Sequence, residues 1–352
     1  MLSQKLKIAL VVFSYFVVSI SMVFVNKYLI TGENTSIPAP FFVTWYQCVI
    51  TVIICWLLGL LGRGKPKQSF LGQFPVQRYD LATGLRILPL STIFVCMITF
   101  NNLCLKYVDV SFYLIARSLT IVFNVLFTFF FLHTTTSFPV ICSLCVVIFG
   151  FFIGNDGQMV FSLWGTVFGV LSSVFVSLNS IYTKKLIYVV DNDSWKLCFY
   201  NNMNACVLFI PFIFYFEYDI IMSHIHVLQS STFWFWMSFA GIVGFLIGIV
   251  TILQIKLTSP LTHNISGTAK ACVQSICAVI FRGETMGLKM IIGSASVLTG
   301  SFLYSYIRSV EMDKATKLAK VSSLSVEQPS DIEKDEITES KPLLTEQNKN
   351  QM

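Results

Sequence analysis

The stretch Pro260–Phe281, with the sequence PLTHNISGTAKACVQSICAVIF, decides the fold class and the chemistry of this chain. It is long enough to cross a bilayer as one helix, which takes about 20 apolar residues. Lys270 lies near its middle, where a charged side chain costs roughly 2.5–3.5 kcal/mol to insert. The stretch contains no Asp or Glu, so we predict that an anion from outside the polypeptide meets this ammonium group.

The composition is that of a protein that crosses the membrane several times. Of 352 residues, 55% are hydrophobic and 12% are charged, and the mean hydropathy is +0.72. Soluble domains carry about a quarter charged residues. We predict an all-α membrane protein with ten transmembrane helices, at 7–30, 40–61, 84–105, 109–131, 138–154, 161–184, 197–216, 232–254, 260–281 and 287–307.

The positive side chains between these segments predict the orientation of the chain. Loops on the cytosolic side carry an excess of Lys and Arg. With a cytosolic amino terminus, that side receives Lys5, Lys7, Arg63, Lys65, Lys67, Arg78, Arg86, Lys184, Lys185, Lys196, Lys256 and Arg308. We therefore expect both termini in the cytosol. The net charge of +6 is largely loop charge and gives no reason to expect nucleic acid as a partner.

The chain contains a weak internal duplication. A shift of 150 positions aligns Lys106 with Lys256 and Phe131 with Phe281 without a gap. Two halves of five helices each must insert in opposite orientations, and such inverted repeats are typical of secondary transporters with a midplane site. We predict a first repeat at 1–154, a second repeat at 155–310 and a disordered cytosolic tail at 311–352.

Two cations within these segments indicate an anionic substrate. Arg117 lies in segment 109–131, and under the overlay it falls on Gly267, about one turn from Lys270. The spanning interiors contain almost no Asp or Glu, so a phosphate or pyrophosphate is the best partner for these side chains. The small neighbours Ser266, Gly267 and Thr268 would allow a ligand or a helix to approach closely. The alternative for Arg117 is that it reaches the headgroups along its aliphatic stem.

Polar side chains in other segments are further candidates for the site. Tyr200, Asn201 and Asn202 offer a ring and amide groups suited to the edge of a base, although such amides also bond neighbouring helices. Tyr15, Ser19 and Met22 share one helix face that we expect to point inward. The remaining candidates are Asn26, Lys27, Tyr113, Thr262 and Asn264.

The sequence shows no pattern of an enzyme. It has no H-E-x-x-H, no G-x-S-x-G and no Gly-Lys-Ser/Thr phosphate loop, so we expect no catalytic residues, no metal and no cofactor. Without nucleotide hydrolysis, transport must be driven by exchange or by a gradient. In the tail, Glu339, Leu343 and Leu344 form the pattern of an acidic dileucine sorting signal; the alternative is an unstructured, solvated tail.

Four runs carry a resemblance to a known family: SISMVFVNKYL, MITFNNLCLKYV, FYNNMNAC and LTSPLTHNISGTAKAC. With them, residues 5–310 resemble the nucleotide sugar transporters of the drug/metabolite transporter superfamily, and in particular their Golgi GDP-fucose branch. SGTAK, ending at Lys270, occupies the place of a G-A-L-N-K motif in the GDP-mannose branch. Only the lysine and the small-residue character are shared, so mannose selectivity is not carried over.

The resemblance implies ten helices, alternating access, and import of GDP-fucose into the Golgi lumen in exchange for GMP. It matches Tyr15 to a binding-site tyrosine and Asn201 and Asn202 to guanine-contacting amides. It matches Lys270 to a phosphate-contacting lysine, and Arg117 to a phosphate-binding lysine of plastid triose-phosphate translocators.

Several alternatives remain at this point. The substrate could be GDP-mannose, a UDP-sugar or an organic phosphate, and the compartment could be the endoplasmic reticulum. A receptor or scaffold that moves nothing is the alternative from another class. Homo-oligomerisation is left open.

Overall fold

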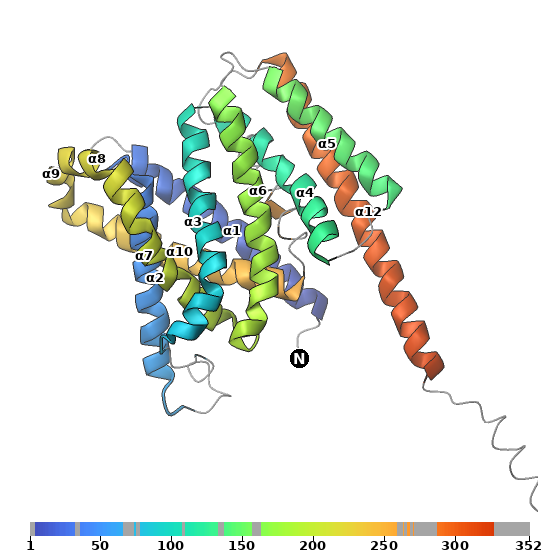
Figure 1. Cartoon of the computed structure of the whole chain (residues 1–352), viewed down its shortest axis with the longest axis horizontal. Coiled ribbons are helices and arrows are strands. Elements are labelled where there is room, and N and C mark those ends of the chain that lie inside the picture. Colours follow the sequence, from blue (N-terminus) through green and yellow to red (C-terminus); the bar gives the residue numbers. More distant parts are fainter. Residues whose placement is uncertain are drawn as a thin grey trace, which may run out of the picture. The chain divides into compact units, whose positions relative to one another are not determined.

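In the computed structural model, the described residues are 4–31, 36–65, 74, 78–107, 110–132, 137–156, 163–258, 263, 266–267, 270 and 287–326. Within these ranges all regular secondary structure is helical (Figure 1). The helices are α1 (Gln4–Thr31), α2 (Pro40–Gly62), α3 (Leu81–Tyr107), α4 (Val110–Leu132), α5 (Phe138–Asp156), α6 (Leu163–Leu186), η2 (Ile187–Val190), α7 (Ser194–Phe216), α8 (Tyr218–Ser223), α9 (Ile225–Leu228), α10 (Ser231–Leu257) and α12 (Leu288–Val326).

The long helices coincide with the predicted membrane segments. Each predicted segment except 260–281 overlaps one long helix, and the ends differ by a few residues up to α10. Segment 260–281 lies mostly outside the described residues, although its His263, Ser266, Gly267 and Lys270 are helical. Among the described helices, five stretches have the length and hydropathy to cross a membrane: Pro40–Gly62, Leu81–Cys104, Leu163–Val190, Ser194–Phe216 and Ser231–Leu257. The chain is therefore an all-helical protein that crosses the membrane several times.

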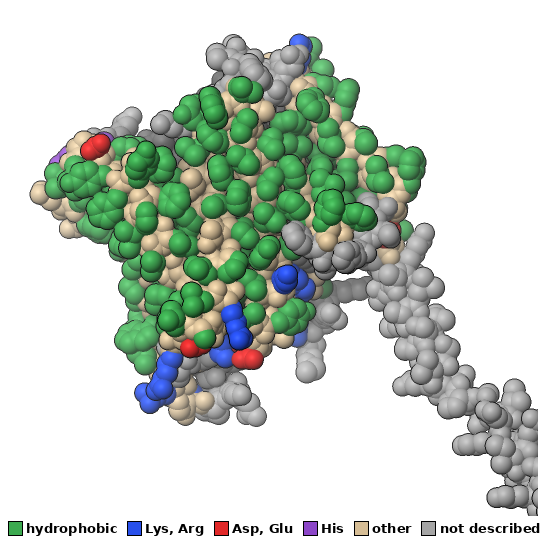
Figure 2. Space-filling view, in the orientation of Figure 1, with side chains coloured by type: hydrophobic (Ala, Val, Ile, Leu, Met, Phe, Trp, Pro, Cys, Tyr) green, Lys and Arg blue, Asp and Glu red, His purple; other side chains and the backbone are tan. Residues whose placement is uncertain are grey.

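The outer surface of these helices is unusually apolar. Large side chains such as Phe13, Phe149, Phe214 and Phe302 are more than half exposed. Figure 2 shows hydrophobic side chains covering most of the visible face, with basic side chains gathered near one end of it. A surface of this kind is costly in water and favourable against lipid tails, which agrees with the predicted membrane setting.

The chain divides into two compact units, Met1–Leu303 and Tyr304–Met352. In the second unit the helical part of α12 runs on to Val326, where the sequence analysis expects a disordered tail from residue 311. The physical reason is local: the run after Glu311 is rich in Lys, Ala and Leu, which favour helix, and it contains neither Gly nor Pro before Pro329. Arg308 also pairs with Glu311, one turn later, at 2.8 Å.

Glycines bring α5 and α12 into backbone contact within the first unit. A Cβ atom built on Gly150 would lie 2.8 Å from the carbonyl oxygen of Gly293, and one built on Gly293 would lie 2.6 Å from the nitrogen of Gly154. No side chain fits at those distances. Because lipid tails are as apolar as leucine, membrane helices gain contact energy mainly through such close approach.

Glu217, the residue after α7, holds the beginning of α2. Its carboxylate oxygens accept hydrogen bonds from the backbone N–H groups of Phe41 and Phe42, both at 2.7 Å, and its side chain is buried. The first N–H groups of a helix have no partner within the helix, so this carboxylate satisfies two of them. Burial raises the pKa of Glu217 from 4.5 to about 7, against the lowering effect of the two N–H donors.

We predict that Glu217 makes stability depend on pH. Because its pKa is raised on folding, its contribution to the free energy of unfolding is full below pH 4.5 and is lost as the pH rises through about 7. The melting temperature of the purified protein, measured from pH 4.5 to 8, should fall less steeply for Glu217→Gln than for the wild type. Asp219→Asn, which removes an exposed carboxylate in α8, should keep the wild-type slope. An unchanged slope in Glu217→Gln would contradict this assignment.

Candidate functional site

A cavity of about 330 Å³ lies within the Met1–Leu303 unit, and we call it the central cavity. Helices α1, α2, α3, α4, α6, α7 and α10 all contribute to its wall. Its volume falls in the range of small-molecule sites, roughly 300–1,000 Å³. The polar residues of the wall are Tyr15, Ser19, Asn26, Thr44, Gln47, Thr51, Arg117, Asn179, Ser180, Thr183, Asn201, Asn202, Thr251, His263 and Lys270.

Lys270 is held against one face of α1. Its Nζ donates to Ser19 Oγ at 2.6 Å and lies 5.9 Å from the centre of the Tyr15 ring. Tyr15 and Ser19 are four residues apart and so stack on the same side of the helix. Gly267, one turn before Lys270, lies beside the Tyr15 hydroxyl, which would be 3.8 Å from a Cβ atom at this position, an ordinary van der Waals contact. The partly polar face of α1 therefore points inward and receives the ammonium group.

Arg117 brings a second positive charge into the central cavity from α4. It lies close enough to interact electrostatically with Lys270, His263 and Tyr15. In the described part of the chain, the wall of the cavity contains Arg117 and Lys270 but no Asp or Glu. Like charges repel strongly where little water separates them, so an anion placed between these two groups lowers the energy of both.

Asn201 and Asn202 reach the same cavity from α7. Asn201 Oδ1 accepts from Ser91 Oγ of α3 at 3.1 Å, and Asn202 Nδ2 donates to the carbonyl oxygen of Cys198 at 2.8 Å. Within the residues that the structure describes, these bonds leave the Nδ2 donor of Asn201 and the Oδ1 acceptor of Asn202 without a partner. The pair thus presents one donor and one acceptor to a ligand.

Tyr200 does not share the central cavity with its two neighbours. Its hydroxyl donates to the carbonyl oxygen of Arg78 at 3.0 Å and accepts from the N–H of Asp80 at 3.1 Å, and the ring lines a separate cavity. Successive residues of a helix point about 100° apart, so Tyr200 and Asn202, two positions apart, point about 200° apart around α7. The predicted contact between Tyr200 and a base thus has no support in the geometry.

A buried amide links α10 to the segment that carries Lys270. Gln254 is fully buried; its Nε2 donates to Ser266 Oγ at 2.8 Å, and its Oε1 lies 3.0 Å from His263 Nδ1. The His263 ring packs edge-on against Tyr15, with centroids 5.0 Å apart. Gln254 therefore anchors this segment to α10. His263 and Lys270 line the central cavity, whereas its described wall does not include the predicted pocket residues Ser266 and Gly267.

The other predicted site residues are only partly described. Asn26 lines the central cavity and accepts from Gln47 Nε2 at 2.8 Å. Thr262, Asn264 and Thr268, the side chains of Lys27 and Tyr113, and the sorting pattern of Glu339, Leu343 and Leu344 lie outside the described residues.

The sequence analysis missed Gln47, Thr51, Asn179, Thr183 and Gln254. A signal was present for the two glutamines: each is a lone amide in an otherwise apolar segment, and polar groups there need partners inside the protein. The hydroxyl groups of α6 gave no such signal, because Ser and Thr are common in membrane helices, where they bond the preceding turn, as Thr183 does to Asn179.

Comparisons with known proteins agree with one another. Residues 6–305 match the Triose-phosphate Transporter family. GDP-fucose transporter 1 of Nematostella vectensis is 48% identical over 320 residues, which cover 90% of this chain and 93% of that protein. GDP-fucose transporter 1 of Mus musculus is 48% identical over 317 residues, with 89% and 86% covered. The protein named "GDP-fucose transporter, Golgi" of Drosophila melanogaster is 41% identical over 319 residues, with 89% and 93% covered.

We predict that Gln254→Leu destabilises the protein by about 1–3 kcal/mol, because it leaves the buried hydroxyl of Ser266 and the ring of His263 without this partner. Thermal unfolding in detergent measures the effect as a lowered melting temperature. Thr299→Val is the control: it removes an exposed hydroxyl bonded only within its own helix, to Ala295 at 2.9 Å, and should change stability by less than about 0.5 kcal/mol. Equal melting temperatures for the two variants would refute the anchoring role.

Proposed function

The chain belongs to the Triose-phosphate Transporter family, and from this premise we propose that it carries GDP-fucose across the Golgi membrane in exchange for GMP. Three sets of evidence support the substrate: the similarity to GDP-fucose transporters over about 90% of the chain, the charge of the central cavity and the amide pair on its wall. The Golgi follows from the name of the Drosophila relative.

The observation that carries the proposal is that two cations, Arg117 and Lys270, line the same cavity. GDP-fucose brings a pyrophosphate and GMP brings a phosphate, and both supply the negative charge that the described wall does not contain. A guanidinium can hold two phosphate oxygens at once, whereas an ammonium acts as a compact point charge. We assign Arg117 and Lys270 to the phosphate groups, with Ser19 and Tyr15 positioning the lysine.

The amides of Asn201 and Asn202 fit a guanine. Guanine presents an oxygen acceptor at O6 and an N–H donor at N2. The Nδ2 of Asn201 and the Oδ1 of Asn202 offer the complementary donor and acceptor, while Ser91 and Cys198 hold the two side chains. We assign base recognition to this pair.

In this proposal, the exchange of GMP for GDP-fucose drives transport. GDP-fucose carries a sugar that is absent from GMP, and both share the guanine and a phosphate, so one cavity can take them in turn. We propose that two inverted halves, 1–154 and 155–310, open the cavity alternately to each side, with both termini in the cytosol. The duplication in the sequence and the loop charges support this arrangement.

We predict that Lys270→Ala and Arg117→Ala each lower exchange at least about tenfold, because each removes a charge-assisted contact with phosphate. The measurement is uptake of labelled GDP-fucose into proteoliposomes preloaded with GMP. Lys289→Ala, which removes an exposed cation near the start of α12, should exchange at the wild-type rate. A wild-type rate in Lys270→Ala would refute the assignment, and absence of any GMP-dependent uptake in the wild type would refute exchange.

We predict that Asn202→Ala reduces the preference for guanine nucleotides. The alanine removes the acceptor that we assign to the guanine N–H donor, so discrimination between GDP- and UDP-sugars should fall by a factor of ten or so. Competition by a panel of unlabelled GDP-fucose, GDP-mannose and UDP-sugars against labelled GDP-fucose measures it. Thr92→Val, which removes an exposed hydroxyl of α3 bonded within its own helix, is the control. Unchanged ratios in Asn202→Ala would exclude the amide from base recognition.

A further inference from the structure

A second cavity, of about 410 Å³, is lined by cations from separate elements, and we call it the basic cavity. Its charged and polar wall consists of Arg63, Arg78, Thr83, Asp191, Lys196 and Tyr200. Arg63 follows α2, Arg78 precedes α3 and Lys196 lies in the first turn of α7. The described walls of the basic and central cavities have no residue in common. Three cations thus converge on a space that the proposed transport does not use.

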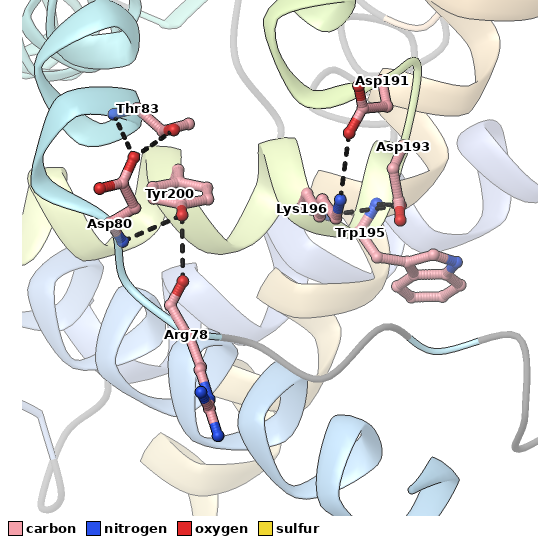
Figure 3. A network of polar contacts seen from close by, with 8 residues as sticks. All are labelled: Arg78, Asp80, Thr83, Asp191, Asp193, Trp195, Lys196 and Tyr200. Atoms are coloured by element: carbon pink, nitrogen blue, oxygen red, sulfur yellow. Dashed lines mark hydrogen bonds and ion pairs between the residues drawn. The ribbon is translucent and has the colours of Figure 1, made fainter. Parts of the chain in front are cut away.

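The backbone around Arg78 is fixed by hydrogen bonds. Tyr200 of α7 bonds the carbonyl oxygen of Arg78 and the N–H of Asp80, as Figure 3 shows. The Asp80 carboxylate then accepts from the N–H of Thr83 at 2.9 Å and from its hydroxyl at 2.6 Å, which caps α3. Arg78 is therefore presented from an anchored segment rather than from a free loop end.

The single carboxylate of the wall offsets little of this charge. Asp191 Oδ2 lies 3.3 Å from Lys196 Nζ (Figure 3). The Asp191 side chain is nevertheless 86% exposed. Ion pairs open to water contribute at most about 1 kcal/mol. An anion that reaches Lys196 and Arg78 together can thus replace this contact, and Arg63 adds further positive charge to the same wall.

Exposed apolar side chains on the adjoining helix ends indicate where the anion comes from. On the last turns of α2, the first turns of α3 and on η2, the exposed residues are Leu60, Leu61, Leu81, Leu85 and Tyr188. In a membrane protein such a band meets hydrocarbon, and basic residues just beyond it meet the phosphate layer of the headgroups. Figure 2 shows the basic side chains gathered beside this largely hydrophobic surface.

We propose that the basic cavity binds a phosphate group, and that this group belongs to the headgroup of an anionic membrane lipid. Arg78 and Lys196 hold the phosphate, and the acyl chains lie along the exposed leucines of α2 and α3. A phosphomonoester headgroup suits the site best, because it carries more charge than a diester and offers three oxygens to the converging donors.

Native mass spectrometry of the purified full-length protein tests the proposal. The probes are dioctanoyl phosphatidylinositol 4-phosphate and, as a lipid without net charge, dioctanoyl phosphatidylcholine. The wild type should bind the first lipid in preference to the second. Arg78→Gln combined with Lys196→Gln should lower that affinity about tenfold or more, while keeping the Arg78 carbonyl that Tyr200 bonds. The control, Arg86→Gln, removes an exposed cation two turns farther along, in α3, and should bind as the wild type does.

Competition separates a lipid from a dissolved phosphate. Inorganic phosphate or GMP at millimolar concentration should leave the lipid bound. If either anion displaces the lipid from the wild type but not from the double variant, the cavity is a phosphate site, and its assignment to lipid is overturned. Equal lipid affinity of the wild type and the double variant would overturn the site itself. Lys270→Ala should still bind the lipid, so a failure of the transport proposal and a failure of this one are distinguishable.

Discussion

A positive charge buried among membrane helices must be balanced inside the protein or by what the protein binds, and this constraint organises the structure. Lys270 lies against Ser19 and Tyr15, and both contacts are with uncharged groups. Arg117 adds a like charge nearby. These hydroxyl and ring contacts reduce the cost of holding the Lys270 ammonium group, but they do not cancel its charge. An anion bound beside Lys270 and Arg117 would lower this electrostatic cost, which agrees with the proposed exchange of one anion for another.

The same constraint explains the hydrogen bonds of Gln47 and Gln254, two glutamines in otherwise apolar helices. In hydrocarbon an unsatisfied polar group costs several kcal/mol, so lone amides need partners on other helices. Gln47 bonds Asn26 across α2 and α1, and Gln254 bonds Ser266 beyond α10. The carboxylate of Glu217 likewise accepts hydrogen bonds from two backbone N–H groups at the beginning of α2. These contacts fix the relative positions of helices whose apolar faces alone would allow sliding.

The long helices could be predicted from the sequence, because the spanning part of each is a long apolar run bounded by polar residues. The sequence could not show how each helix is rotated about its own axis, and so which side chains face a cavity. Asn201 and Asn202 reach the central cavity while Tyr200, their neighbour, faces another, and that depends on how α7 is rotated against α3. Short helices such as α8 and α9 were not predicted from the sequence, because a run of 4 to 6 residues is too short to show a helical periodicity. α12 continues to Val326, beyond the predicted end of the last segment at residue 307, because the residues that follow favour helix.

Consecutive residues of α7 face two different cavities, and this has a thermodynamic consequence. Tyr200 belongs to the wall of one and Asn201 to the wall of the other, on a single rigid turn. Any rotation of that turn alters both walls together. If an occupant of one cavity favours a particular rotation, it changes the affinity of the other cavity, and reciprocity requires the reverse effect to be equally large. The bilayer around the carrier would then set its working affinity, with no residue of the transport site having changed.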